Sequence, residues 1–282
     1  MGSSGTLGKN LMSVLTKKFD VFHNGLTVSK IDITKFNDLN KLLNKCNPDL
    51  IINCAAITNI DLCEINKKIS YSVNVLSLKK IFLIKKKNKL KFKLIQISTD
   101  QMYNNKKNIS SNENAKTFKH NEYTKQKLEC EKICLKNKCL ILRVNFFAYD
   151  EKNIFFWILK MAKSKKKINL FKDIYFSPIS VISLSKIISK IIPKFINTNI
   201  YGLFNLGSAN SINKSNFCIY ILKKIKKVQC NYRIVESHNF LKTKRSTNMS
   251  MDINKFQEIF KIKLPNIKKE INTYLKIVNA KI

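Results

Sequence analysis

Three apolar runs constrain the fold of this chain more than any other feature of its sequence. They occupy residues 50–58 (LIINCAAIT), 93–103 (KLIQISTDQMY) and 139–147 (CLILRVNFF). The first stops at small residues, and the second ends in hydroxyls and a carboxylate. Continuous apolar runs of this kind are typical of strands buried on both faces of a parallel sheet. Predicted helices separate the runs, so the alternation predicts an α/β fold with a Rossmann-like, doubly wound and mainly parallel sheet.

The same rhythm predicts how the chain divides. It is regular up to Asp150 and looser beyond it, so we expect a Rossmann-like domain over residues 1–150 and a smaller, mixed α/β domain over residues 151–282. A short strand expected at residues 202–207 (GLFNLG) is a candidate to return to the first sheet. A chain of 282 residues is long enough to bury a real core as one large domain or two small ones.

The first eight residues, MGSSGTLG, place Gly2, Gly5 and Gly8 three apart in front of a predicted helix. Glycines let the backbone approach a pyrophosphate, and the helix N-terminus adds free N–H groups and a positive dipole. A glycine pattern alone is weak evidence. In such motifs a central strand leads into the first glycine, but here only Met1 precedes Gly2. We therefore expect a natural start several residues upstream, with an apolar β-run; the alternative is a degenerate chain.

The net charge of +35 is typical of proteins that bind nucleic acids. Only three of the 53 basic residues are arginines (Arg143, Arg233 and Arg245), however, and base and phosphate recognition relies heavily on arginine. Lysines are spread along the chain together with Asn and Ile, and the codons of all three are A/T-rich. A biased genome explains these enrichments together, so we expect no specific nucleic-acid partner, although nonspecific binding to polyanions at low salt follows from the charge.

The eight cysteines form neither a CxxC pair nor a Cys/His cluster with zinc spacing, so no metal is expected. Cys130, Cys134 and Cys139 lie along or just beyond one predicted helix, and we expect them to fill the core as small apolar side chains. The chain has no apolar stretch of roughly 18 residues, and no basic start followed by an apolar run. These features predict no membrane span and no signal peptide, and they favour the cytoplasm.

Tyr123 and Lys127 are candidates for acid–base chemistry. They lie four residues apart in residues 121–131 (NEYTKQKLECE), a predicted helix, so both point from one helical face. A free tyrosine has a pKa of about 10, too high for proton exchange at neutral pH. A nearby ammonium favours the phenolate and lowers that pKa. In a chain so rich in lysine, this spacing also arises by chance.

Four motifs occur in order along the chain: the glycine pattern, NCAA at residues 53–56, STD at residues 98–100, and the pair Tyr123 and Lys127. Together they resemble the extended short-chain dehydrogenase/reductase family. Within it the chain is most similar to the dTDP-4-dehydrorhamnose reductases and related sugar-nucleotide reductases. The strings that carry the resemblance, from PDLIINCAAITNIDLCE to KRSTNMSMD, cover almost the whole chain after Gly2.

The resemblance implies an NAD(P)-dependent oxidoreductase that reduces a nucleotide-linked 4-keto sugar for polysaccharide biosynthesis. Tyr123 would protonate the carbonyl oxygen, Lys127 would hold the nicotinamide ribose, and Thr99 would hydrogen-bond the substrate. The first domain would bind NADPH or NADH, and the second the sugar nucleotide. The implied cofactor contacts are Gly2, Gly5, Leu7, Gly8, Asp32, Ile33, Ala55, Ala56, Thr58, Tyr123 and Lys127. The implied substrate contacts are Thr99, Asp100, Phe146 and Arg245.

Several alternatives remain open at this point. The alternative interpretation of Thr99 is a cap of the next segment, and that of Asp32 is a turn former. Gln101 stands where the rhamnose reductases often carry Tyr, and Phe146 where they often carry Trp, although Phe can still stack on a base. A sugar-nucleotide epimerase and a non-catalytic regulatory or binding subunit of the same fold are the alternative functions. A homodimer is one expected assembly.

Overall fold

The computed structural model describes residues 1–23, 31–164, 166–225, 230–241 and 243–279. By spatial proximity the chain forms two compact units. The first unit comprises Met1–Thr99, Lys119–Arg143 and Ser185–Phe204, and the second comprises Asp100–Phe118, Val144–Leu184 and Asn205–Ile282. Each unit is assembled from three separate segments of the chain. The expected division at Asp150 into two functional domains therefore stays a prediction.

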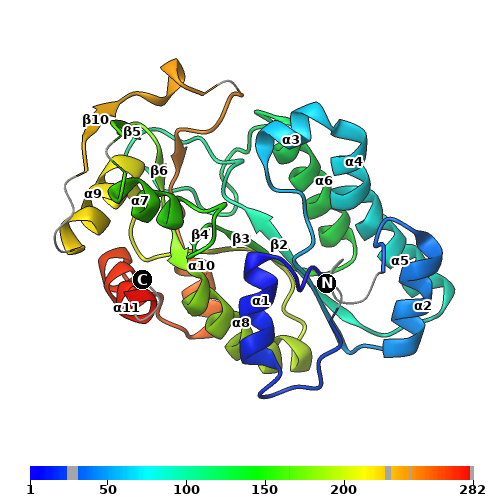
Figure 1. Cartoon of the computed structure of the whole chain (residues 1–282). Helices are drawn as coiled ribbons and strands as arrows, with labels where there is room; N and C mark the ends of the chain where they lie inside the picture. Colours follow the sequence, from blue (N-terminus) through cyan, green and yellow to red (C-terminus); the bar gives the residue numbers. More distant parts are fainter. Residues whose placement is uncertain (24–30, 165, 226–229, 242, 280–282) are drawn as a thin grey trace. The chain divides into compact units, whose positions relative to one another are not determined.

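A four-stranded sheet in the order β1-β2-β3-β8 forms the framework of the first unit (Figure 1). Its strands are β1 (Leu50–Asn53), β2 (Lys93–Thr99), β3 (Leu140–Val144) and β8 (Gly202–Leu206). β1 and β2 run parallel, with Leu50 opposite Lys93. The strands lie across the sheet in the order in which they occur in the sequence, and helices connect neighbouring strands. The α/β fold with a mainly parallel sheet, predicted from the apolar runs, is confirmed.

Two of the helices that accompany this sheet begin at a side-chain cap. The side chain of Asn59 accepts a hydrogen bond from the Leu62 N–H at 3.0 Å, which starts α3. Asn121 and Thr124 cap each other's backbone N–H groups, which starts α6. The helices are α1 (Thr6–Leu15), α2 (Phe36–Cys46), α3 (Ile60–Ile65), α4 (Lys67–Tyr71), a π-helix η1 (Ser72–Leu76), α5 (Ser77–Lys87), α6 (Glu122–Lys136) and α8 (Val181–Asn197).

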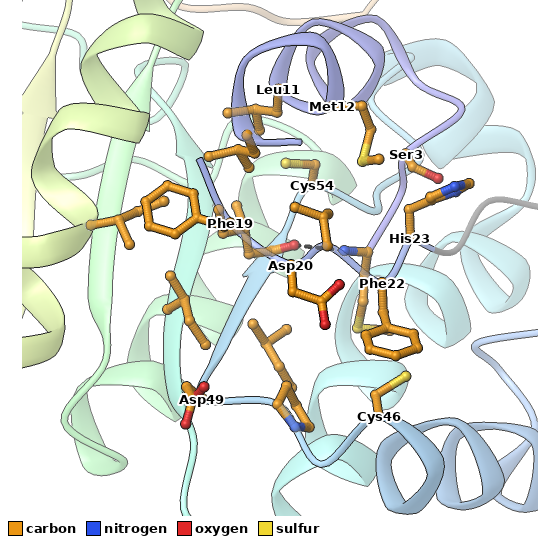
Figure 2. A pocket seen from close by; sticks show the side chains of 18 of the residues that line it. Ser3, Leu11, Met12, Phe19, Asp20, Phe22, His23, Cys46, Asp49 and Cys54 are labelled. Atoms are coloured by element: carbon orange, nitrogen blue, oxygen red, sulfur yellow. Dashed lines mark hydrogen bonds between the residues drawn. The ribbon is translucent and has the colours of Figure 1, made fainter. Parts of the chain in front are cut away.

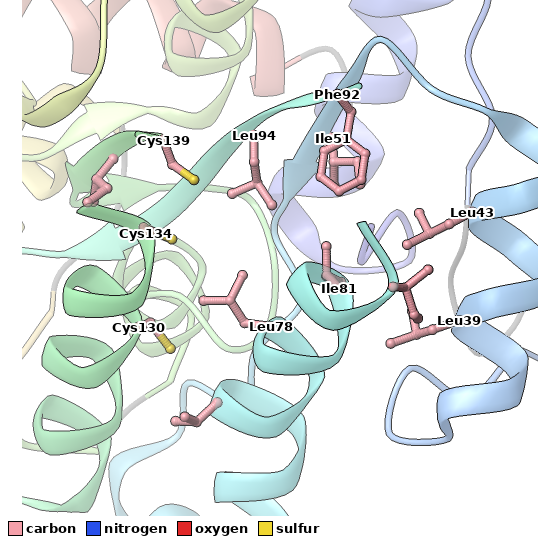
Figure 3. Close-up of a cluster of buried hydrophobic side chains, with 13 residues drawn as sticks. Leu39, Leu43, Ile51, Leu78, Ile81, Phe92, Leu94, Cys130, Cys134 and Cys139 are labelled. Carbon is pink, nitrogen blue, oxygen red and sulfur yellow. The ribbon is translucent and has the colours of Figure 1, made fainter. Parts of the chain in front are cut away.

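A hydrophobic core lies between the sheet and helices α2, α5 and α6 (Figure 3). Leu39 of α2 and Ile81 of α5 are fully buried, and they belong to the same cluster as Leu94 of β2. The three cysteines at 130, 134 and 139 are members of this core, as predicted, and none is more than 2% exposed. Burial raises the pKa of the Cys130 thiol to about 11, so this sulfur stays protonated and apolar at neutral pH.

Met1 lies beside β1. Its ammonium donates a hydrogen bond to the Ile52 carbonyl oxygen at 2.7 Å, and its own carbonyl accepts one from the Cys54 N–H at 3.1 Å. Burial lowers the pKa of this ammonium. A cavity of about 300 Å³ adjoins Met1, with Leu11 and Phe19 among its apolar lining (Figure 2). The expected strand ahead of Gly2 lies outside the sequence and stays a prediction.

The described residues of the second unit form three small sheets. β5 (Ile168–Phe171) pairs in parallel with β10 (Tyr232–Val235), and β4 (Phe146–Phe147) with β7 (Ile179–Ser180). The third sheet has the order β11 (Asn248–Met249), β6 (Tyr175–Phe176) and β9 (Ile212–Asn213). The helices of this unit are α7 (Ile154–Ala162), α9 (Lys214–Lys224), a 3₁₀ turn η2 (Ser237–Asn239), α10 (Asn254–Phe260) and α11 (Ile267–Asn279).

Aromatic rings form the centre of the second unit. Phe147 stacks on Phe155 with ring centroids 5.4 Å apart, and both rings meet Tyr274 edge to face. Phe217 of α9 also contacts Phe147 at 5.5 Å. Because aromatic side chains bury large apolar surfaces, these contacts let short strands and helices share one core.

In the described part of the chain, none of the helices has the length and apolar character needed to cross a bilayer. Across the same residues, His, Cys, Asp and Glu side chains do not gather in groups of three or more that would suit a metal ion.

Candidate active site

Tyr123 and Lys127 lie one turn apart on the buried face of α6, as the sequence spacing predicts. Each is 5% exposed. The Lys127 Nζ atom is 6.0 Å from the centroid of the Tyr123 ring, and it donates a hydrogen bond of 3.0 Å to the Ile97 carbonyl oxygen. The capping interaction at Asn121 fixes where α6 begins, and it therefore fixes the position of Tyr123 in the first turn.

The environment of Lys127 makes its charge effective on its neighbours. Burial is the main influence and lowers the pKa of the ammonium, while Cys130, Cys54 and Glu131 raise it. A charge that is poorly screened by water acts strongly over short distances. A buried ammonium one helical turn from a phenol is the arrangement expected for a tyrosine that acts as a general acid, and this role of Tyr123 stays a prediction.

Thr99 is the last residue of β2 and follows Ile97, the residue that Lys127 contacts, by two positions. Its side chain is buried, with 5% exposed. The first unit thus brings the end of β2 together with the face of α6 that carries Tyr123 and Lys127. The three predicted catalytic residues belong to neighbouring elements of one unit, and their catalytic roles stay predictions.

The glycines at the N-terminus form a tight loop against the segment after β1. Gly2 has a φ of +75°, and a Cβ atom built there would lie 2.7 Å from the Ala55 nitrogen. A Cβ on Gly8 would lie 2.1 Å from the Gly2 carbonyl oxygen. α1 begins directly after Gly5, and no side chain caps its first turn. These features fit a dinucleotide, whose pyrophosphate needs a close backbone approach and free N–H groups at a helix start.

The segment after β1, which includes Ala55 and Ala56, is held in place by amide side chains. Asn74 accepts a hydrogen bond from the Ile57 N–H at 2.8 Å and donates one to the Ile57 carbonyl oxygen at 3.0 Å. It also donates to Gln126 of α6 at 2.7 Å. Neither Asn74 nor Gln126 belongs to a motif recognised in the sequence. Asn74 lies in the π-helix η1, a kind of element that often occurs at functional sites.

The remaining predicted cofactor contacts have different surroundings. Asp32 accepts hydrogen bonds from both the N–H and the hydroxyl of Thr34, at 2.8 and 2.7 Å, so it forms the turn that was its alternative interpretation. These bonds lower the pKa of its carboxyl. Leu7 is buried at the start of α1, Ile33 packs against the core, and Thr58 is exposed. Contacts of Asp32, Ile33 and Thr58 with a cofactor stay predictions.

The second unit contains the other predicted substrate contacts. Asp100 is 1% exposed and accepts a hydrogen bond from the Asn145 side chain at 2.7 Å. Phe146, the residue after Asn145, lies in β4 and pairs with Ile179 of β7. Arg245 precedes Ser246, whose hydroxyl donates to the Gln101 carbonyl oxygen at 2.6 Å.

Lys214 is a cation that the sequence analysis missed. Its backbone N–H donates to the carbonyl oxygen of Ile174, the residue before the middle strand β6 of the sheet β11-β6-β9. Burial, and next to it the charge of Arg245, lower the pKa of the Lys214 ammonium, while Asp100 and Asp173 raise it. The Lys214 ammonium is thus within electrostatic reach of one other cation and two carboxylates of the second unit. In the sequence, Lys214 could have been noticed because it directly follows Asn213, the residue that caps α9.

Comparisons with known proteins agree on one family. A family model described as RmlD substrate binding domain matches residues 1–280. The dTDP-4-dehydrorhamnose reductase of Aggregatibacter actinomycetemcomitans is 25% identical over 93% of this chain and 92% of its own length. The Salmonella typhimurium enzyme of the same name is 25% identical over 78% of this chain and 77% of its own length.

Solved structures show the same fold. The dTDP-4-dehydrorhamnose reductase from Bacillus anthracis in complex with NADP has a TM-score of 0.86 at 21% identity and covers 98% of this chain and 97% of its own. UDP-glucose 4-epimerase from Thermus thermophilus, in complex with NAD, has a TM-score of 0.80 at 10% identity, covering 100% of this chain and 98% of its own. The fold is therefore common to reductases and epimerases, and the fold alone does not separate the two activities.

Proposed function

The chain belongs to the RmlD substrate binding domain family, and from this premise we propose that it is an NAD(P)H-dependent reductase of a nucleotide-linked 4-keto sugar. The relatives named dTDP-4-dehydrorhamnose reductase support this activity. The single observation that carries the proposal is the buried Tyr123 and Lys127 pair on α6, with the Lys127 ammonium held at the Ile97 carbonyl of the strand that ends at Thr99.

The proposed reaction adds a hydride to the carbonyl carbon and a proton to the carbonyl oxygen. A bound reduced nicotinamide supplies the hydride. Tyr123 donates its phenolic proton to the oxygen, and Lys127 stabilises the phenolate that remains. Thr99 donates a hydrogen bond that holds the carbonyl oxygen in place. Polar groups fixed before the reaction starts need no reorganisation when charge develops, which lowers the barrier.

The first unit offers the residues that would hold the cofactor. The loop of Gly2, Gly5 and Gly8 would receive the pyrophosphate at the start of α1, and Ala55 and Ala56 would leave room along the end of β1. The cofactor is NADPH or NADH, and the NADP complex of the Bacillus anthracis relative favours NADPH.

For the substrate, we propose that Arg245 forms charge-assisted hydrogen bonds to the diphosphate and that Phe146 stacks on the nucleotide base. We further propose a cytoplasmic location, where sugar nucleotides are made and used, and no specific nucleic-acid partner. A homodimer stays a prediction.

Incubation of the protein with nucleotide-linked 4-keto sugars and either NADPH or NADH tests the activity. We expect one substrate to cause loss of absorbance by the reduced cofactor, with formation of the corresponding alcohol. Interconversion of two sugars without net consumption of cofactor would instead identify an epimerase. Cofactor binding without turnover of any candidate sugar would identify a non-catalytic subunit.

A further inference from the structure

A buried ion pair lies next to the candidate catalytic residues. Arg143 of β3 donates two hydrogen bonds to Glu131 of α6, from Nε to Oε1 at 2.9 Å and from Nη2 to Oε2 at 2.6 Å. The Ser98 hydroxyl of β2 donates a third bond to Oε1 of the same carboxylate at 2.6 Å. All three residues are 3% exposed. One carboxylate on the helix is therefore bound by both neighbouring strands.

The position of Glu131 links this cluster to Lys127. Glu131 follows Lys127 by four residues, so both side chains leave α6 on the same face, one turn apart. Lys127 contacts the carbonyl oxygen of Ile97, and Glu131 contacts Ser98, the next residue of β2. The helix is thus attached to two successive residues of the strand that ends at Thr99, and Arg143 attaches it to β3 as well.

Stability alone does not explain a buried ion pair. Taking two charges out of water is costly, and an apolar pair of similar volume is often equally stable or more stable. A two-pronged arginine–carboxylate contact differs from an apolar contact because it has a defined direction and distance. A helix packed only by apolar side chains can rotate or slide slightly without losing contact area, whereas these three hydrogen bonds are lost if it does.

We propose that Glu131, bound by Arg143 and Ser98, is a positioning residue that fixes the rotation and height of α6 on the sheet. It thereby places the Lys127 ammonium where the nicotinamide ribose of the cofactor would bind. The inference rests on the proposed function only through this role of Lys127. Glu131 acts through Lys127 and does not itself contact the substrate or cofactor.

The test replaces the cluster by apolar residues and separates positioning from stability. In the triple variant Ser98→Ala, Glu131→Leu and Arg143→Leu, no charge or hydroxyl of the cluster is left buried and unpaired. We expect its melting temperature to return close to that of the wild type, above that of either Glu131→Leu or Arg143→Leu alone. We expect its Kd for NADPH, measured by the fluorescence of the bound cofactor, to rise at least 10-fold.

An exposed ion pair on the same helix provides a matched control. Glu129 of α6 and Lys79 of α5 lie 2.7 Å apart, with side chains 37% and 41% exposed. The variant Glu129→Leu with Lys79→Leu should leave the Kd for NADPH unchanged. A rise in Kd equal to that of the triple variant would show that any change to α6 weakens binding, and it would overturn the proposal.

Two other results would also overturn it. A triple variant with a restored melting temperature and a wild-type Kd would show that Glu131 has no positioning role. A wild-type protein that binds neither NADPH nor NADH would remove both this inference and the proposed function. A wild-type protein that binds NADPH but reduces no sugar would refute the proposed function alone, because the readout here is cofactor affinity.

Discussion

The Lys127 ammonium donates a hydrogen bond of 3.0 Å to the main-chain carbonyl oxygen of Ile97, and this contact joins the helix of Tyr123 to the strand that ends at Thr99. A main-chain carbonyl accepts the bond whether or not a ligand is present, so Lys127 is held in place before any cofactor arrives. Its buried charge then needs no further ordering to act on Tyr123.

Removal of the Tyr123 hydroxyl tests the proton donor. We expect Tyr123→Phe to lower kcat by at least about 10²-fold, because general acid catalysis contributes about that much. The Kd for NADPH should stay within a few-fold of the wild type, since the ring still packs in its buried site. Steady-state kinetics and fluorescence titration check the two values. A near-normal kcat would show that another group supplies the proton.

Replacement of Lys127 tests a trade-off between stability and function. We expect Lys127→Met to weaken NADPH binding, to shift the pH–rate profile and to keep or raise the melting temperature at pH 7. Burial lowers the pKa of Lys127, so the unfolded chain holds this proton more tightly than the folded one. The wild type should therefore gain stability from this group as the pH rises toward the ordinary lysine range, and the variant should not.

Thermal unfolding as a function of pH, together with fluorescence titration, measures these effects. Lys125→Met is the matched control, because Lys125 lies on the same helix and its side chain is 52% exposed. Unchanged cofactor affinity and an unchanged pH–rate profile in Lys127→Met would show that Lys127 does not serve the cofactor.

Alanine at Gly8 should disrupt the N-terminal loop more than alanine at Gly5. A Cβ on Gly8 would lie 2.1 Å from the Gly2 carbonyl oxygen, whereas one on Gly5 would lie 3.4 Å from the same atom. We expect Gly8→Ala to lower the unfolding free energy by about 1–3 kcal/mol, as overpacking does, and to weaken NADPH binding. Denaturant unfolding and fluorescence titration check this. Equal effects of both substitutions would contradict the close approach at Gly8.

Substitution of the two cations or the aromatic ring proposed to bind the sugar nucleotide should change the KM for that substrate and not the KM for NADPH. We expect Arg245→Ala, Lys214→Met and Phe146→Ala each to raise the KM for the sugar nucleotide, by roughly 10-fold for the cations, since bonds to charged groups contribute about 1.5–3 kcal/mol. The KM for NADPH should not change. Lys223→Met, at an exposed position on the same helix as Lys214, is the control. Equal damage to both constants would indicate misfolding.

Local sequence determined much of the fold. The apolar runs at residues 50–58, 93–103 and 139–147 contain β1, β2 and β3, because long apolar stretches can be buried on both faces of a sheet; the third run also contains the short strand β4 of another sheet. Asn121 set the start of α6, and the four-residue spacing placed Tyr123 and Lys127 on one face. Periodicity and capping depend on neighbours in the chain, so the sequence contains this information directly.

Contacts between distant segments were decided only by the tertiary structure. Asn74 holds the Ile57 backbone, Glu131 binds Arg143 and Ser98, and Lys214 lies within the electrostatic reach of Arg245. The local sequence around these residues does not identify their partners. Buried polar groups must be paired, but many pairings are possible in a chain so rich in Asn and Lys. Packing of the helices on the sheet selects one of these pairings, and that selection requires the whole fold.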